Sequence, residues 1–307
     1  MIIVNLCTFL TLYSSVFVSQ SASRCSFNTS ESWVVLSSIE HRIKTKIEAV
    51  GVPLKDWEIY IYRGILTGYN EAFIIDGKKK DELIASDAKS AEIIRPILRG
   101  RDIKKYGYDY ANLWLINTHN GIKEKGVKPI NINDYPAIKD HLDLCFPQLR
   151  KRADKGDTPY NLRNCAYMED FYKQKIIYPE ITKFLNFYLD ENKFFVNNKC
   201  FIMTGEKLHF LTAFFNSSVF KYCFKNNFPE LLGGTRELRK VFLEQLPVIQ
   251  ITEADNNEFM KLIRKRDSLM DTKLPTRTID LEIDEKIFNL YGLTNQEKKE
   301  IGFIEIQ

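Results

Sequence analysis

The chain has 307 residues, a hydrophobic content of 44% and a net charge of +4. This length can hold one large domain or two ordinary ones, and the apolar fraction is sufficient for a real core. The mildly basic charge excludes a uniformly cationic chain, so any nucleic-acid surface must be a local patch.

The cysteines and histidines are spread widely along the chain, without a Cys-x-x-Cys pair. The histidines do not cluster near the cysteines, so the spacing predicts no metal site. Scattered cysteines in a chain of this length are typical of reduced, buried residues, and we therefore expect a cytoplasmic protein. The residues concerned are Cys7, Cys25, Cys145, Cys165, Cys200, Cys223, His41, His119, His141 and His209.

Residues 1–18 form an apolar run that is followed by small polar residues. The run imitates a secretory signal, but no Lys or Arg precedes it, and it is too short and too polar for a membrane span. We expect residues 1–29 to be a remnant of, or a junction to, an upstream domain, without membrane contact. The alternative is the signal peptide of a secreted protein.

The next segment, residues 33–50, carries isoleucines at helical spacing with charged residues on its other faces. This pattern predicts an amphipathic helix, with Ser37 or Ser38 as its N-cap. Glycine and proline at residues 51–53 end it.

Two glycines interrupt the strand pattern that follows. Alternation predicts a strand over residues 59–63, and an apolar strand resumes at residues 73–75. Gly64 and Gly68 lie between these strands, where glycine marks a turn or a close approach of another backbone. The pattern favours a hairpin with special backbone angles; the alternative is a backbone-lined contact with a phosphate.

A basic run follows at residues 94–106. Five cations fall within eleven residues, with tyrosines beside them, and Pro96 and Gly100 break the run into short pieces. Cations interleaved with aromatic rings suit phosphate neutralisation and base stacking. The alternative is a solvated basic turn. The cations are Arg95, Arg99, Arg101, Lys104 and Lys105.

The rest of the chain alternates between expected strands and helices. Apolar runs predict strands over residues 110–118, 175–181, 193–203 and 242–251, with a turn at residues 186–192. Helical spacing covers residues 78–91, 136–144, 206–225, 253–270, 281–291 and 294–300. This order predicts a mixed α/β (α+β) fold with helices toward the C-terminus.

Two further loops carry side chains suited to reading DNA bases. Arg163 and Asn164 lie in a basic segment at residues 148–167. Arginine can pair with guanine, and asparagine can pair with adenine. The alternative is that both make internal hydrogen bonds. Gly233 and Gly234 precede three cations (Arg236, Arg239 and Lys240), and their amides could approach a DNA backbone.

Several segments together resemble the TaqI-like C-terminal specificity domain. This domain is the target-recognition part of adenine-N6 DNA methyltransferases and of type IIG restriction-modification enzymes. One departure is Leu232, which stands where relatives show a third glycine. The segments are Arg63-Gly64-Ile65-Leu66-Thr67-Gly68-Tyr69-Asn70-Glu71-Ala72-Phe73, Pro96-Ile97-Leu98-Arg99-Gly100-Arg101-Asp102-Ile103, Asn161-Leu162-Arg163-Asn164-Cys165-Ala166-Tyr167, Lys175-Ile176-Ile177-Tyr178-Pro179-Glu180-Ile181, Phe201-Ile202-Met203-Thr204-Gly205, Gly233-Gly234-Thr235 and Gln245-Leu246-Pro247.

The resemblance implies a DNA target-recognition domain over residues 30–250, with an antiparallel or mixed sheet, and a C-terminal helical segment over residues 251–307. It also implies double-stranded DNA as the partner. We expect one set of residues to hold the DNA backbone and a second set to read bases. The first set is Arg63, Thr67, Asn70, Arg99, Arg101, Lys104 and Lys105, and the second is Arg163, Asn164, Arg236, Arg239 and Lys240.

The chain lacks the motifs that the family uses for catalysis. We find neither an Asn/Asp-Pro-Pro-Tyr/Phe motif, which holds the flipped adenine, nor a glycine-rich cofactor loop. We therefore expect a recognition module without a catalytic residue, and S-adenosylmethionine would belong to a missing methyltransferase domain. The alternative is an active methyltransferase or endonuclease that is completed by a partner catalytic chain.

Overall fold

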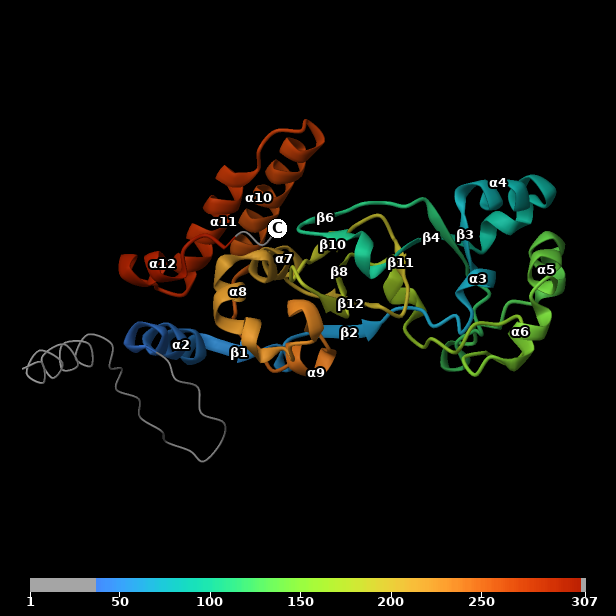
Figure 1. Ribbon diagram of the computed structural model, residues 1–307, viewed down its shortest axis with the longest axis horizontal. Helices are drawn as coiled ribbons and strands as arrows, with labels where there is room; N and C mark the ends of the chain where they lie inside the picture. Colours follow the sequence, from blue (N-terminus) through green and yellow to red (C-terminus); the bar gives the residue numbers. More distant parts are fainter. Residues whose placement is uncertain (1–36, 305–307) are drawn as a thin grey trace, which may run out of the picture.

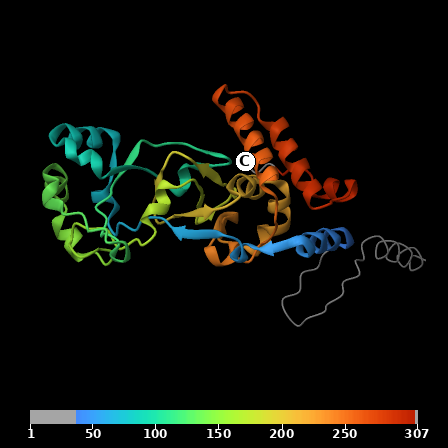
Figure 2. The same ribbon diagram turned by 180° about the vertical axis from the view of Figure 1, so that it is seen from behind.

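A four-stranded antiparallel sheet lies at the centre of the chain, between two groups of helices (Figures 1 and 2). The structure, a computed structural model, describes residues 37–304, so the expected junction at residues 1–29 lies outside the described residues. The strand order is β10 (Tyr188–Asp190), β8 (Lys175–Pro179), β12 (Cys200–Gly205) and β2 (Ile59–Arg63).

The central sheet separates two hydrophobic cores, because successive side chains of a strand point to opposite faces. On β8, Ile176 and Tyr178 pack into the first core, whereas Ile177 packs into the second. On β12, Met203 belongs to the first core and Ile202 to the second. All five side chains are fully buried, which explains why these strands carry nearly continuous apolar sequence.

Helices that cover one face of the central sheet form the first core. These are α2 (Ser38–Val50), α7 (Leu208–Asn216), α8 (Ser218–Phe224), α10 (Glu253–Asp271), α11 (Arg277–Leu290) and α12 (Asn295–Ile301), beside a two-stranded sheet of β1 (Gly51–Pro53) and β14 (Pro247–Ile249). Phe214 and Phe215 of α7 are fully buried and pack against Phe220 of α8. The expected cap of α2 is confirmed, since Ser37 and Glu40 form a capping box.

A second sheet and its helices form the other lobe. The strand order is β11 (Phe195–Val196), β4 (Ile94–Leu98), β7 (Leu113–Ile116) and β3 (Ile74–Asp76), and only the β11–β4 pair is parallel. The helices are α3 (Asn70–Phe73), α4 (Gly77–Ser86), α5 (Pro136–Asp143) and α6 (Phe146–Lys151), at the right of Figure 1. The mixed α/β fold with antiparallel and mixed sheets is therefore confirmed.

Short elements lie where the two lobes meet. β5 (Ile103–Lys104) pairs with β6 (Gly107–Tyr108) and contacts β8, and β9 (Ile181–Thr182), which follows β8, pairs with β13 (Arg236–Glu237). The short helix α9 spans Lys240–Leu243. Single 3-10 turns occur at Leu54–Asp56, Ala88–Glu92, Gly100–Asp102, Lys123–Lys125, Ile132–Asp134, Met168–Tyr172, Lys225–Asn227 and Leu232–Gly234. We call the junction between the lobes, where β5, β6, β9 and β13 lie, the waist.

The expected hairpin around Gly64 and Gly68 is wrong. β2 pairs with β12 of the central sheet, whereas β3 pairs with β7 of the second sheet, so the chain crosses from one lobe to the other. The glycines do mark a close backbone approach. A Cβ on Gly64 would lie 2.1 Å from the carbonyl oxygen of Asn197, and Gly68 has a φ of +68°.

Other expected elements also differ from the structure, and the strand expected over residues 193–203 is divided between β11 of the second sheet and β12 of the central sheet. The turn at residues 186–192 contains β10, an edge strand of the central sheet. The helix expected over residues 206–225 is broken at Ser217, which has extended backbone angles and caps α8 with its side chain. The strand expected to start at residue 242 starts at Pro247, because residues 240–243 form α9. At α8, the capping side chain of Ser217 prevailed over apolar periodicity.

The C-terminal helices do not have a core of their own. Phe259 of α10 and Ile283 of α11 are buried in the same core as α7. No boundary between hydrophobic cores falls at residue 250, so the division of the chain at this residue stays a prediction from the sequence. Among residues 37–304, no helix is long and apolar enough to cross a membrane.

Candidate nucleic-acid interface

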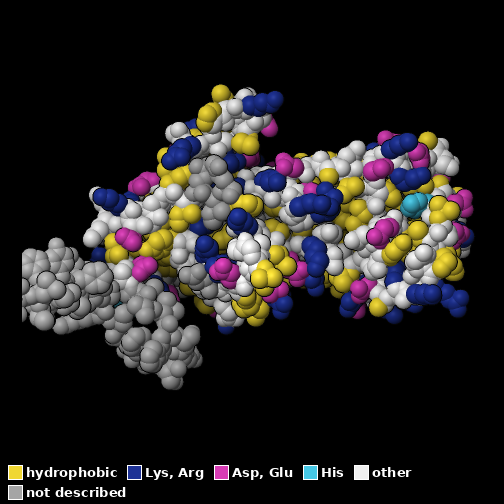
Figure 3. Space-filling view, in the orientation of Figure 1, with side chains coloured by type: hydrophobic (Ala, Val, Ile, Leu, Met, Phe, Trp, Pro, Cys, Tyr) yellow, Lys and Arg dark blue, Asp and Glu magenta, His cyan; other side chains and the backbone are white. Residues whose placement is uncertain are grey.

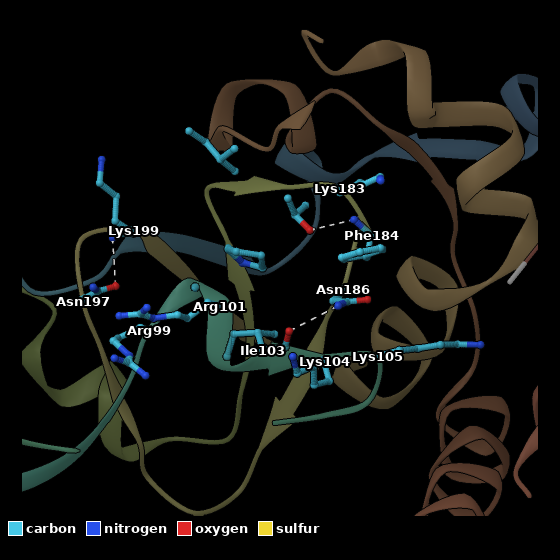
Figure 4. Close-up of a pocket in the computed structure, with 14 residues that line it drawn as sticks. Arg99, Arg101, Ile103, Lys104, Lys105, Lys183, Phe184, Asn186, Asn197 and Lys199 are labelled. Carbon is cyan, nitrogen blue, oxygen red and sulfur yellow. Dashed lines mark hydrogen bonds between the residues drawn. The ribbon is translucent and has the colours of Figure 1, made fainter. Parts of the chain in front are cut away.

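A cationic groove of about 850 Å³ opens at the waist of the molecule. Fourteen residues line it, and neither Asp nor Glu is among them. The cations are Arg99, Arg101, Lys104, Lys105, Lys183 and Lys199, which come from the basic run, the segment after β9 and the turn before β12. Figure 3 shows Lys and Arg side chains gathered between the lobes, and Figure 4 shows the groove itself. We call it the waist groove.

A tight turn at the start of the waist groove separates two arginines by role. The side chain of Arg99 donates to both carboxylate oxygens of Asp102, at 3.0 and 2.8 Å, and its amide donates to Asp102 at 2.8 Å. Gly100 is close to the carbonyl oxygen of Lys199, since an added Cβ would lie 3.3 Å away. Arg99 is thus used to hold the turn. Arg101 is exposed, and within residues 37–304 it has neither a hydrogen bond nor an ion pair.

The two lysines of the basic run also differ. Lys104 is exposed and lies 3.2 Å from the exposed carboxylate of Asp109. Lys105 extends away from Arg99 and Arg101 (Figure 4), and its Nζ lies 3.0 Å from the buried Asp280 of α11. Lys104 is therefore available to an anion, whereas Lys105 is already paired with an internal carboxylate.

Two groove cations lie outside the residues that the sequence predicted. Lys183 is exposed and makes only a distant contact with the ring of Phe184, 6.0 Å away, among the described residues. Lys199 is exposed and lies 3.8 Å from Glu180. They join the basic run because Glu180 donates its amide to the carbonyl of Lys199 across the strand pair β8–β12. No local sequence signal marks this long-range pairing.

A second groove, of about 620 Å³, is lined by Glu180, whose chain neighbours Pro179 and Ile181 line the waist groove. The guanidinium of Arg63 lies 2.7 Å from one oxygen of Glu180, and Lys199 lies near the other oxygen. Arg63 also donates to the carbonyl of Asn198 at 2.9 Å. Arg239 and Lys240 line the same groove, and both side chains are exposed. Arg239 forms an ion pair with Glu237, and Lys240 forms one with Glu244. The structure thus brings one predicted backbone residue together with two predicted readout residues.

Thr67 is a correction to the predicted site. Only 3% of its surface is exposed, and its hydroxyl donates to the side-chain oxygen of Asn70 at 2.6 Å. Its carbonyl accepts a hydrogen bond from the buried Arg152. A phosphate cannot reach the Thr67 side chain in this arrangement, whereas Asn70 remains exposed.

Arg152 fixes the crossing segment between the lobes. Its guanidinium donates to the carbonyls of Thr67, Asp154, Pro159 and Asn161. It also lies 4.6 Å from the centre of the Phe73 ring. Burial lowers the pKa of Arg152 to about 10, a value at which it is still charged at neutral pH. Arg152 lies in the basic segment at residues 148–167, but nothing in the sequence of that segment marks this arginine as buried.

The remaining readout residues divide into exposed and buried. Arg163 is exposed and lies 2.9 Å from Asp154, and the exposed Asn164 accepts a hydrogen bond from Asn120. Both side chains therefore make internal contacts, which was the alternative to base readout, and neither residue lines the two grooves described above. Arg236 is a second correction: it is 8% exposed and donates to the carbonyl of Phe228 and to Glu230. It supports its own loop and is not available to a base.

The sequence between residues 95 and 248, half of the chain, matches the TaqI-like C-terminal specificity domain. The chain belongs to this family. The matched segment runs from β4 to β14 and contains every cation of the waist groove, together with Arg239 and Lys240 of the second groove. The segment with Arg63, Thr67 and Asn70 precedes it.

Two solved structures share the fold of this specificity domain. The type IIL restriction-modification enzyme MmeI, in complex with DNA, is 15% identical with a TM-score of 0.59, over 81% of this chain and 35% of MmeI. The type IIG restriction endonuclease BpuSI is 16% identical with a TM-score of 0.50, over 83% of this chain and 33% of BpuSI. The chain therefore spans about a third of the length of either enzyme. No curated protein matches the chain.

Proposed function

We propose that the chain is the sequence-specific DNA recognition module of an adenine-N6 DNA methyltransferase or type IIG restriction-modification enzyme. The observation that carries this proposal is the waist groove of a member of a specificity-domain family: six of its lining residues are cations and none is Asp or Glu, and Arg101 and Lys183 have no carboxylate partner within residues 37–304. A groove of one sign of charge raises the local concentration of a polyanion and speeds its association. Duplex DNA is the polyanion that a specificity domain would have to bind.

The free cations divide the work of holding the DNA backbone. Arg101 and Lys183 would neutralise phosphates first, because within residues 37–304 neither has a carboxylate partner to give up. Lys104 and Lys199 have only loose or exposed partners, so the loss of those pairs costs little. The exposed Arg239 and Lys240 of the second groove would then face the bases or the adjacent phosphates.

The catalytic step would belong to another domain or chain. S-adenosylmethionine supplies the methyl group in such enzymes, but it carries a sulfonium cation. The waist groove is lined by six cations and lacks a carboxylate among its lining residues, so it does not fit this cofactor. We propose that a methyltransferase domain or subunit supplies the cofactor site and that this chain positions it on the target.

The proposal can be tested by selection of random duplex DNA with the purified chain at two salt concentrations. A double variant, Arg101→Ala with Lys183→Ala, removes two groove charges. Its control, Lys44→Ala with Lys299→Ala, removes two exposed charges from α2 and α12 at the far end of the first lobe. We expect wild type to enrich one short motif, and the groove variant to lower the slope of log affinity against log salt by about 1.8, at about 0.9 per phosphate contact.

The outcomes separate the parts of the proposal. Failure of wild type to bind DNA at low salt would refute a DNA-recognition module that acts by itself. Binding that depends on salt but enriches no sequence would refute sequence-specific recognition by the chain alone. Equal slopes for the groove variant and its control would refute the assignment of the waist groove.

A further inference from the structure

A short loop carries a leucine that is almost fully exposed beside the two cationic grooves. Leu232 is 97% exposed, and Leu231 before it is half-exposed. Gly233 and Gly234 follow, both with positive φ and with open space where a Cβ would lie. The loop therefore presents one large apolar side chain at a narrow tip.

The loop is held in this shape by its own hydrogen bonds. The amide of Leu231 donates to the carbonyl of Thr235 at 2.8 Å, and the hydroxyl of Thr235 donates to the carbonyl of Leu232 at 3.1 Å. At the base, the buried Arg236 pairs with Glu230 at 2.6 Å and with the carbonyl of Phe228. The exposure of Leu232 is thus a property of an ordered turn, and little conformational entropy would be lost when it meets a partner.

The position of the loop points to its partner. Its base continues into β13, where Arg236 pairs with Thr182 and Glu237 pairs with Ile181 of β9. Ile181 and Thr182 line the waist groove, while the next residues along the loop strand, Arg239 and Lys240, line the second groove. Glu230 and Arg236 form an isolated β-bridge, and Leu232 is only two residues beyond it. At a rise of about 3.3 Å per residue, the Cα of Leu232 lies within about 7 Å of the Cα of Glu230 in this bridge.

We propose that Leu232 is an apolar wedge that enters a groove of the bound duplex and contacts the bases, between phosphates that are held in the two cationic grooves. This inference rests on the proposed DNA-recognition function. Leucine is among the side chains that proteins insert against or between base steps. Single exposed apolar residues are common on surfaces, but this one stands at the tip of a hydrogen-bonded turn whose base continues into residues next to both cationic grooves.

Duplex DNA is favoured over a protein partner by the surroundings of the tip. The centre of a protein interface is apolar and poor in charge, whereas the exposed apolar side chains of Ile181 and Val241 lie among the cations of the two grooves, and two glycines follow Leu232. The exposed cations Arg239 and Lys240 of the second groove and Lys183 of the waist groove complement phosphates. Glu230 is the one exposed acid of the loop itself, and Arg236 neutralises it.

The test compares Leu232→Ala with Leu232→Met and with Leu144→Ala. Leu144 is a matched control, because it is 82% exposed and follows α5 in the second lobe. Affinity for the motif selected by wild type would be measured across a range of salt concentrations, and the selection would be repeated with each variant. Thermal unfolding checks that the variants remain folded, as expected for such exposed positions.

We expect Leu232→Ala to bind the selected motif about tenfold more weakly and to relax the preference at one or two adjacent base pairs. Its salt slope should equal that of wild type, since an apolar contact releases no counterions. Leu232→Met should retain most of the affinity, and Leu144→Ala should behave as wild type.

Three results would overturn the inference. Unchanged affinity and preference in Leu232→Ala, while wild type binds its motif, would refute the wedge and leave the proposed function intact. A lower salt slope in Leu232→Ala would show that the change acts through nearby cations instead. Absence of DNA binding by wild type would refute the proposed function and the wedge together.

Discussion

Replacement of Arg152 by leucine should strongly destabilise the segment that crosses between the lobes. Arg152 is 6% exposed, and its guanidinium donates to four carbonyls. Bonds to a charged donor contribute about 1.5–3 kcal/mol each, so the four together, taken near the lower end of this range because they share one guanidinium, contribute about 7 kcal/mol. The pKa of Arg152, lowered to about 10, shows that burial of the cation costs about 3 kcal/mol, which a neutral side chain recovers. The net loss is about 4 kcal/mol.

Urea denaturation followed by circular dichroism would measure this loss. The thermal midpoint should fall by about 10 °C, given about 2–4 °C per kcal/mol for a chain of this size. Arg150→Leu is the control, because Arg150 is exposed in the last turn of α6 and should change stability by under about 0.5 kcal/mol. A loss below about 1 kcal/mol for Arg152→Leu would refute the reasoning, since it would mean that water replaces the guanidinium at little cost.

Three further predictions concern buried or shared carboxylates. Asp190→Asn leaves Lys175 charged and fully buried without its partner, so thermal unfolding should show a loss of about 3–5 kcal/mol, and equal stability would contradict this view of the pair. Burial raises the pKa of Asp284 above 3.8, so the native state binds this proton more tightly than the unfolded state. Wild type should therefore lose stability relative to Asp284→Asn as pH rises from about 4 through the native pKa, as measured by urea unfolding at several pH values, whereas a constant difference would contradict the cause. Glu180→Gln should free the guanidinium of Arg63, and the salt slope of DNA binding in fluorescence anisotropy should rise by up to about 1; weaker binding at an unchanged slope would show that the carboxylate instead orients the arginine.

Periodicity in the sequence was sufficient for most of the elements. The isoleucines of α2 and the apolar stripes of α10 and α11 lie on the core, as the helical spacing predicts. Pairing between distant strands caused some failures, such as the expected hairpin around Gly64 and Gly68, and a polar side chain with a second use caused another. Ser217 caps α8 with its hydroxyl and so ends a helix that the apolar residues alone would continue.

The candidate site was less predictable, because it depends on pairing between distant strands. Arg101 and Lys104 of the basic run are exposed and line the waist groove, and their contact with a DNA backbone stays a prediction. Lys183 and Lys199 reach the same groove only through the β8–β12 pair and the segment after β9, which local sequence does not reveal. The sequence also cannot distinguish a buried polar residue from an exposed one, so Thr67 was placed on the surface.

Paired residues and outward-pointing residues differ in what they can do, even within one motif such as Arg99-Gly100-Arg101, and this difference has a physical reason. Pattern residues such as Arg99, Thr67 and Glu180 hold turns and cross between lobes through paired, largely buried contacts. The side chains without such partners, Arg101 and Leu232, point outward. A residue that already satisfies internal donors and acceptors cannot exchange them for DNA without a cost of about 1–3 kcal/mol for each group left unpaired. Under the proposed function, contacts with DNA would therefore be made by the outward residues, while the paired ones hold the fold.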